Sequence, residues 1–172
     1  MSDECAELEK RSREYAEKTL RSMWSIQAIS WYNNSEPGSV EYYLDRFMGI
    51  DGKIRTTSGI SFTFQAKCRD YEKYDRFGDW TLEHMSNDRG AEGEFFHLAA
   101  DIYIYGWENL EKNDFEDVYV FYISPVKRAI MSGQLRHTCE KPNWEYGTAT
   151  FRCYDWEDFN PLWILHHKGA PI

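Results

Sequence analysis

The chain has 172 residues, of which 42% are hydrophobic, 28% charged and 17% aromatic, and its formal net charge is −9. This length predicts a single domain over residues 1–172, and the composition excludes a disordered, collagen-like or low-complexity chain. With so many aromatic residues, rings must build much of the core.

The negative charge is unevenly distributed. Residues 91–117 carry eight acidic side chains and one basic side chain, a net charge of −7, whereas residues 118–154 carry five basic and two acidic side chains, a net charge of +3. Because an acidic lobe can coexist with a basic surface, the total charge does not exclude a nucleic-acid partner. If DNA binds, we expect residues 91–117 to face away from it.

No apolar run approaches the roughly 18 residues that a membrane-spanning helix needs. The acidic start, Met1-Ser2-Asp3-Glu4, is also unlike a secretory signal. We therefore expect a soluble cytoplasmic protein without a membrane partner. The cysteines do not form a disulfide framework in a chain of this length, so reduced thiols are expected; the four are Cys5, Cys68, Cys139 and Cys153.

Hydrophobic periodicity and turn-forming residues divide the chain into short elements. In chain order they are a helix at 4–24, a loop at 25–40, an amphipathic segment at 41–48, a strand entering a turn at 49–53, strands at 60–69 and 79–85, a segment of mixed helix and strand character at 95–107, a buried strand at 118–124, a helix at 126–135 and an edge strand at 147–154. This order predicts an α/β (α+β) fold with a central mixed β-sheet flanked by helices.

The strand at 60–69 carries the candidate chemistry. Its apolar side chains share one face, while Gln65, Lys67 and Arg69 share the other. Asp51 lies 14 residues before Gln65, so hairpin pairing of the two segments would carry it alongside Gln65. Mg²⁺ takes carboxylate and amide oxygen ligands, and a nearby lysine can orient water or stabilise phosphate charge. These residue types suit metal-assisted hydrolysis of a phosphodiester.

The same residues carry a resemblance to a known superfamily. Ile50-Asp51, followed by Gln65-Ala66-Lys67 on the next strand, resembles the motif of the PD-(D/E)XK nucleases, which include restriction endonucleases, resolvases and many phage nucleases. The resemblance implies a restriction-endonuclease-like core over about residues 5–135, with an aromatic-rich extension at 136–172. Ile50 stands where the superfamily usually has proline, and Gln65 stands where it usually has an acid.

The resemblance implies a divalent-metal-dependent endonuclease acting on DNA, in phage genome processing, recombination or repair. Asp51, Gln65 and Lys67 would be catalytic, and Mg²⁺ or Mn²⁺ would be held by Asp51, the Gln65 oxygen and the backbone carbonyl of Ala66. Because Gln65 is neutral, we expect weak metal affinity in the free protein. The remaining implied residues are Glu17 and Glu83 as further metal ligands, and Arg69, Lys127 and Arg128 as contacts to DNA. The resemblance is also compatible with a homodimer.

Other interpretations stay open at this stage. Gln65 and Lys67 can lie on a solvated strand face, and Asp51-Gly52 is also a common hairpin turn. A nuclease-like fold without catalysis would act as a nucleic-acid-binding or protein-binding module, and a pocket lined by aromatic rings would bind a small molecule. The aromatic residues after 143 favour a core or interface role over stacking on bases. A zinc site lacks the usual paired spacing of cysteines and histidines.

Overall fold

The structure is a computed structural model that describes residues 3–32, 35–70, 79–86, 91–111, 113–142 and 149–168. Its helices are α1 (Asp3–Met23), α2 (Val40–Met48), α3 (Glu94–His97) and α4 (Ile123–Met131), with a 3₁₀ helix η2 (Trp156–Leu162). Its strands are β1 (Ile26–Trp31), β2 (Gly52–Thr56), β3 (Ser61–Asp70), β4 (Trp80–Met85), β5 (Ile102–Asn109), β6 (Asp114–Tyr122), β7 (Cys139–Pro142), β8 (Thr150–Tyr154) and β9 (Trp163–Lys168).

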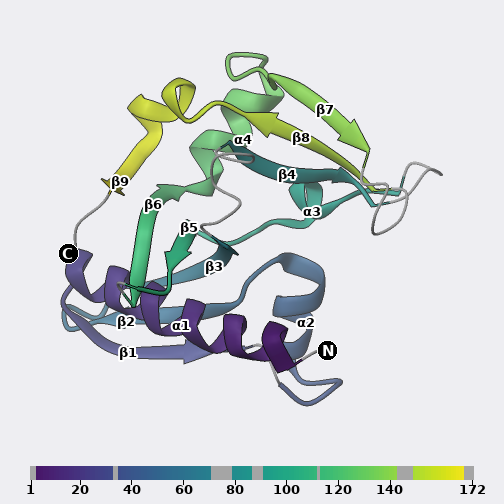
Figure 1. Cartoon of the computed structure of the whole chain (residues 1–172). Coiled ribbons are helices and arrows are strands. Elements are labelled where there is room, and N and C mark those ends of the chain that lie inside the picture. The colour runs from purple at the N-terminus through teal and green to yellow at the C-terminus, as the bar shows by residue number, and fades with distance from the viewer. Residues whose placement is uncertain are drawn as a thin grey trace.

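Within the described ranges the strands form two sheets. The larger has six strands in the order β1-β2-β3-β5-β6-β9, and the smaller has three in the order β4-β8-β7. In the larger sheet β3 and β5 are parallel and every other neighbouring pair is antiparallel. Figure 1 shows the small sheet on the opposite side of the molecule from α1. The expected mixed sheet with flanking helices is therefore confirmed.

Helix α1 covers one face of the large sheet. Its Tyr15, Ala16 and Leu20 are buried against a cluster that includes Phe64 and Ile104, at the spacing expected for one helix face. Two ion pairs also fasten α1 to the sheet: Arg11 Nε lies 3.1 Å from Glu108 Oε2, and Lys18 pairs with Asp114. As the alternation predicts, Phe64 on β3 faces this helix, which leaves Gln65 and Lys67 on the other face.

An aromatic core fills the space between the two sheets. Trp80 of β4 is fully buried there, with ring centroids 5.4 Å from Phe121 and 5.1 Å from Phe159. Trp156 stacks on Tyr119 at 3.8 Å. Residues from the C-terminal part thus belong to the core, as expected for Tyr154, Trp156 and Phe159; Trp144 lies outside the described residues.

Several boundaries differ from the expectation. The region 25–40 contains strand β1, and 79–85 is a strand of the small sheet instead of the third strand of the large one. The strand expected at the edge, 147–154, contains β8, which lies between β4 and β7. Asp51 and Gly52 do not form a turn, because the chain from Gly52 runs directly into β2. No described helix is long and apolar enough to cross a membrane.

Candidate functional site

The first residues of β2 pair with the middle of the antiparallel strand β3. In the ladder Gly52 lies opposite Phe64, and the Asp51 N–H donates to the Phe64 carbonyl at 2.8 Å. Asp51 Oδ2 accepts a hydrogen bond from the Ala66 N–H at 2.8 Å. The two segments therefore pair as a hairpin that places Asp51 next to Gln65, as the spacing predicts.

Asp51 and Gln65 share a cavity of about 290 Å³ with residues of α2, β4 and α3. Its lining is strongly acidic and contains one Arg and one His among the described residues. The lining consists of Asp45, Arg46, Phe47, Gly49, Asp51, Gln65, Glu83, Glu92, Gly93, Glu94 and His97. Five carboxyl groups facing one small volume repel one another, so the cavity favours a cation.

The pKa of Asp51 reflects both its burial and the nearby carboxylates. The pKa of the Asp51 carboxyl is raised to about 7, mainly by burial and to a smaller extent by the carboxylates of Asp45 and Glu94, against the opposing hydrogen bond from the Ala66 N–H. The pKa of Glu83 is also raised, first by burial and then by Glu94. A divalent cation among these groups would reverse both shifts, because it stabilises the ionised carboxylates.

Lys67 does not line the cavity itself but forms an ion pair with Glu94, which does. Its Nζ lies 2.9 Å from Glu94 Oε2, and the Tyr103 hydroxyl donates to Glu94 Oε1 at 3.1 Å. Glu94 is thus held by two donors, and Lys67 is oriented by a residue that lines the cavity. Sequence reasoning missed Glu94, which stands in the −7 stretch expected to face away from DNA. Glu92 and Glu94 both line the cavity, so these two residues do not face away from the candidate site, while the orientation of the stretch toward DNA stays a prediction.

The donor set fits a hard divalent cation. Gln65 Oε1 is buried and has no hydrogen-bond partner among the described residues, which is costly unless a ligand satisfies it. The Ala66 N–H donates to Asp51, so the Ala66 carbonyl also lies on the edge of β3 that faces β2, because both backbone groups of one strand residue face the same neighbouring strand. Carboxylate, amide and backbone oxygens are the ligands that Mg²⁺ and Mn²⁺ take. With Glu94 and Asp45 also present, weak affinity no longer follows from the neutral Gln65.

Glu83 lies at the cavity as proposed from the sequence, but Glu17 does not. Glu17 Oε1 accepts a hydrogen bond from the Trp31 indole N–H at 2.9 Å, and Glu17 Oε2 lies 3.9 Å from Arg21 Nη2. Glu17 thus forms an ion pair with a residue four positions along the helix, which is common on a charged helix.

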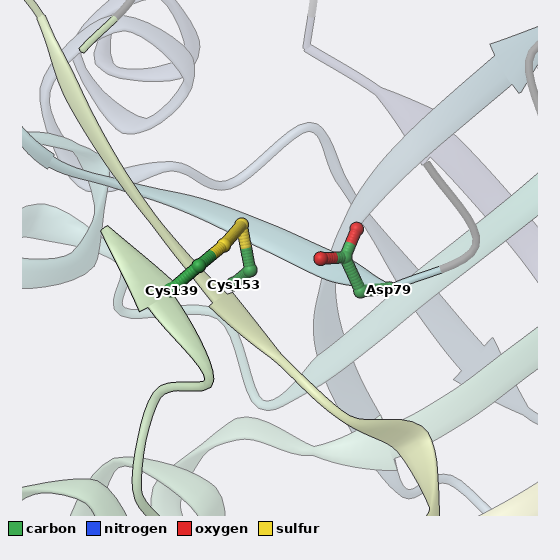
Figure 2. A group of neighbouring side chains, drawn as sticks. All are labelled: Asp79, Cys139 and Cys153. Carbon is green, nitrogen blue, oxygen red and sulfur yellow. A yellow bond between two sulfur atoms is a disulfide. The ribbon is translucent and has the colours of Figure 1, made fainter. Parts of the chain in front are cut away.

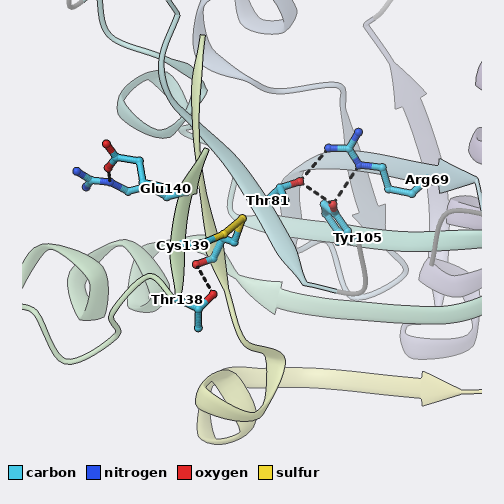
Figure 3. Close-up of a disulfide and its surroundings, with 8 residues drawn as sticks. Arg69, Thr81, Tyr105, Thr138, Cys139 and Glu140 are labelled. Carbon is cyan, nitrogen blue, oxygen red and sulfur yellow. Dashed lines mark hydrogen bonds and ion pairs between the residues drawn. A yellow bond between two sulfur atoms is a disulfide. The ribbon is translucent and has the colours of Figure 1, made fainter. Parts of the chain in front are cut away.

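Two of the three basic residues expected to contact DNA have partners within the protein. Arg69 donates to the Tyr105 hydroxyl at 3.1 Å and to Thr81 Oγ1 at 3.0 Å, which ties β3 to β5 and to the small sheet (Figure 3). Lys127 donates to the Leu98 carbonyl at 3.0 Å, and burial lowers its pKa. Arg128 is exposed on α4. None of the three lines the cavity.

The cysteines depart from the expectation of reduced thiols. Cys139 on β7 and Cys153 on β8 lie directly opposite each other and form a disulfide, with Cα atoms 5.2 Å apart. Figure 2 shows Asp79 beside this pair, and one ligand atom from each of the three lies within 4.8 Å of the others. The disulfide occupies both sulfurs, so in this state they provide no thiolate for a metal. Cys68, in contrast, is a free thiol whose pKa is raised by burial to about 12.

Comparisons with protein-family models, with curated proteins and with solved structures gave no match.

Proposed function

We propose that this protein is a divalent-metal-dependent deoxyribonuclease with a PD-(D/E)XK-like site. One observation carries the proposal: Asp51, Gln65 and the Lys67–Glu94 pair converge on a single acidic cavity. Asp51 has one structural contact, the hydrogen bond from the Ala66 N–H, whereas Gln65 Oε1 has none among the described residues. A buried carboxyl with a raised pKa beside an unsatisfied amide oxygen is a costly arrangement, and such arrangements are common at functional sites.

The topology supports the proposal. The chain forms a helix (α1), three strands that pair antiparallel (β1, β2 and β3, with α2 inserted between β1 and β2) and then, after a segment containing α3, a strand parallel to the third (β5). Apart from the inserted α2, this is the order of helix, three strands, helix and strand that the resemblance implies, although β1 takes the place of the strand expected at 79–85. In this chain the helix of the crossover is only four residues long, and strand β4 of the small sheet lies in the same crossover.

The proposed roles follow from the positions of the donors. Asp51, Gln65 Oε1, the Ala66 carbonyl and Glu94 would hold Mg²⁺ or Mn²⁺, and Asp45 and Glu83 would add negative charge around it. Such an ion activates a water molecule and stabilises charge on the phosphate. Lys67 would donate hydrogen bonds to the attacking water or to a phosphate oxygen. Tyr103 would keep Glu94, and through it Lys67, in position.

A second candidate is a nuclease-like module that binds DNA without cutting it. Gln65 in place of an acid favours it, because one negative charge is missing from that strand position. The presence of Glu94 at the same cavity argues for catalysis, since it restores a carboxylate next to Lys67.

The experiment that tests the proposal is incubation of the protein with plasmid, branched and single-stranded DNA in Mg²⁺, Mn²⁺ or EDTA. Cleavage of at least one substrate with metal, and none in EDTA, is expected. Binding to DNA without cleavage in either metal would favour the second candidate, and cleavage that persists in EDTA would contradict the metal role.

A further inference from the structure

Helix α2 exposes most of its apolar face, although Leu44 on the same face packs against the core. Val40, Tyr43 and Phe47 follow one another at spacings of three and four residues, which places them on one side of the helix, and they are 69%, 53% and 59% exposed. No residue of α2 is fully buried. Surface helices normally direct this stripe toward the core, so an exposed stripe indicates a binding surface.

Two of the exposed rings contact each other and stand on a well-defined helix. Tyr43 and Phe47 stack with their centroids 5.6 Å apart and their planes at 27°. Ser39 caps the helix by accepting a hydrogen bond from the Tyr42 N–H at 3.1 Å, and Gly49 ends it with φ +54°. The rings therefore stand on a short helix that is fixed at both ends.

This surface is continuous with the acidic cavity. Phe47 lines the cavity together with its neighbour Arg46, whose side chain is 68% exposed. Figure 1 shows α2 and α3 at the same end of the molecule, and α3 exposes a further ring, Phe96, next to His97 of the cavity lining. A phosphodiester held in the cavity would place its neighbouring bases beside these rings.

We propose that α2 is a base-stacking surface that selects DNA with unpaired nucleotides at the cleavage site. The proposal rests on the proposed nuclease function and adds its substrate class. Bases inside a duplex are stacked on one another, so their faces are not available to a protein ring, whereas unpaired bases stack on aromatic side chains without regard to sequence. Rings and a single arginine suit this partner better than duplex DNA, which is bound mainly through cations on its phosphates.

The test measures binding of a labelled oligothymidine and of a blunt duplex by fluorescence anisotropy in Ca²⁺, which takes the same oxygen ligands as Mg²⁺ in a looser geometry, so that the carboxylates of the cavity are neutralised while cleavage is suppressed. The wild type should bind the oligothymidine more tightly than the duplex. Tyr43→Ser and Phe47→Ser should each lose about tenfold in affinity for the oligothymidine. Tyr122→Ser is the matched control, since Tyr122 is 40% exposed and lies outside the cavity lining, and it should bind like the wild type.

Two further measurements complete the test: the salt dependence of oligothymidine affinity and the mass of the protein in solution. Because Arg46 is the one Lys or Arg of the cavity lining within the described residues, oligothymidine affinity should fall with salt by a slope near that of one phosphate contact. Unchanged affinity in both ring variants overturns the proposal. So does a dimer, detected by light scattering, that dissociates in Tyr43→Ser while DNA binding stays unchanged, because α2 would then contact a second copy.

Failure of the two proposals can be distinguished. Ring-dependent binding to oligothymidine without cleavage in any metal would leave the stacking surface standing and remove the nuclease function. Metal-dependent cleavage with equal rates on paired and unpaired substrates, unaffected by Phe47→Ser, would keep the nuclease function and remove the stacking surface.

Discussion

Asp51 has a buried carboxyl whose charge is unfavourable in the metal-free fold. Its pKa rises from 3.8 to about 7, so between these values the folded protein holds a proton that the unfolded chain has released. The free energy of unfolding therefore falls as pH rises through this window and stays low above it. Asp51→Asn removes this penalty.

We expect Asp51→Asn to be more stable than the wild type at about pH 8, by about 2 kcal/mol, and to have nearly equal stability at about pH 4. Urea unfolding at both pH values measures the difference. A variant that is less stable than the wild type at the higher pH would show that the carboxylate is stabilised by the fold, in contradiction to the electrostatic account. Adding Mg²⁺ should stabilise the wild type more than the variant.

Substitutions of Lys67 and of Glu94 should differ in their effects on metal affinity and on the cleavage rate. Lys67→Ala removes a donor to water or phosphate and should spare metal affinity while lowering the cleavage rate by about 100-fold or more. Glu94→Gln removes a carboxylate and the partner of Lys67, so it should weaken metal binding as well as slow cleavage. Calorimetric titration with Mn²⁺ and single-turnover cleavage give the two quantities. Equal metal affinity in Glu94→Gln and the wild type would remove Glu94 from the ligand set.

At the scale of elements, the site depends on close packing of β1, β2 and β3. A Cβ on Gly52 would lie 2.6 Å from the ring of Phe64 and would also meet the Ser30 carbonyl. Gly52→Ala should therefore push β2 away and lower the free energy of unfolding by about 1–3 kcal/mol. Gly59→Ser offers a comparison, because Gly59 has open space around it; its φ of +84° carries its own strain cost of about 1 kcal/mol. A Gly52→Ala protein as stable as the wild type would contradict the close approach of Gly52 to Phe64 and Ser30.

The disulfide gives a second prediction at this scale. It closes a loop of 14 residues between β7 and β8, so reduction should lower the free energy of unfolding by about 2–4 kcal/mol. Denaturation with and without a thiol reductant measures this, and the double variant Cys139→Ser/Cys153→Ser is the control in which the reductant should have no effect. A wild type whose stability ignores the reductant would indicate that the bond does not form in solution.

At the scale of the whole molecule, the sequence predicted those elements whose structure depends on neighbouring residues in the chain. The long amphipathic α1 and the alternating β3 follow directly from periodicity, and the spacing of Asp51 and Gln65 follows from hairpin pairing. The second sheet was not predictable in this way, because β4 pairs with β8, and residues 86–149 lie between them in the chain. No local pattern encodes such a partner.

The missed residue has a similar explanation. Glu94 begins a four-residue helix within an acidic stretch, where net charge suggested a solvated lobe. The acidic residues of 91–117 instead have different contacts. Glu108 and Asp114 form ion pairs with α1, while Glu94 lines the cavity. Its position directly before the rings Phe95 and Phe96, in a region otherwise ambiguous between helix and strand, was the available signal.

The central claim is that Asp51 is the carboxylate around which DNA hydrolysis takes place, and cleavage by Asp51→Asn tests it most directly. Asp158→Asn, an exposed aspartate on η2, is the matched control. With Mg²⁺ or Mn²⁺ the wild type and Asp158→Asn should cut DNA at the same rate, and Asp51→Asn should lose about 100-fold or more of that rate while remaining folded. Cleavage by Asp51→Asn at the rate of the wild type would place the chemistry elsewhere in the molecule.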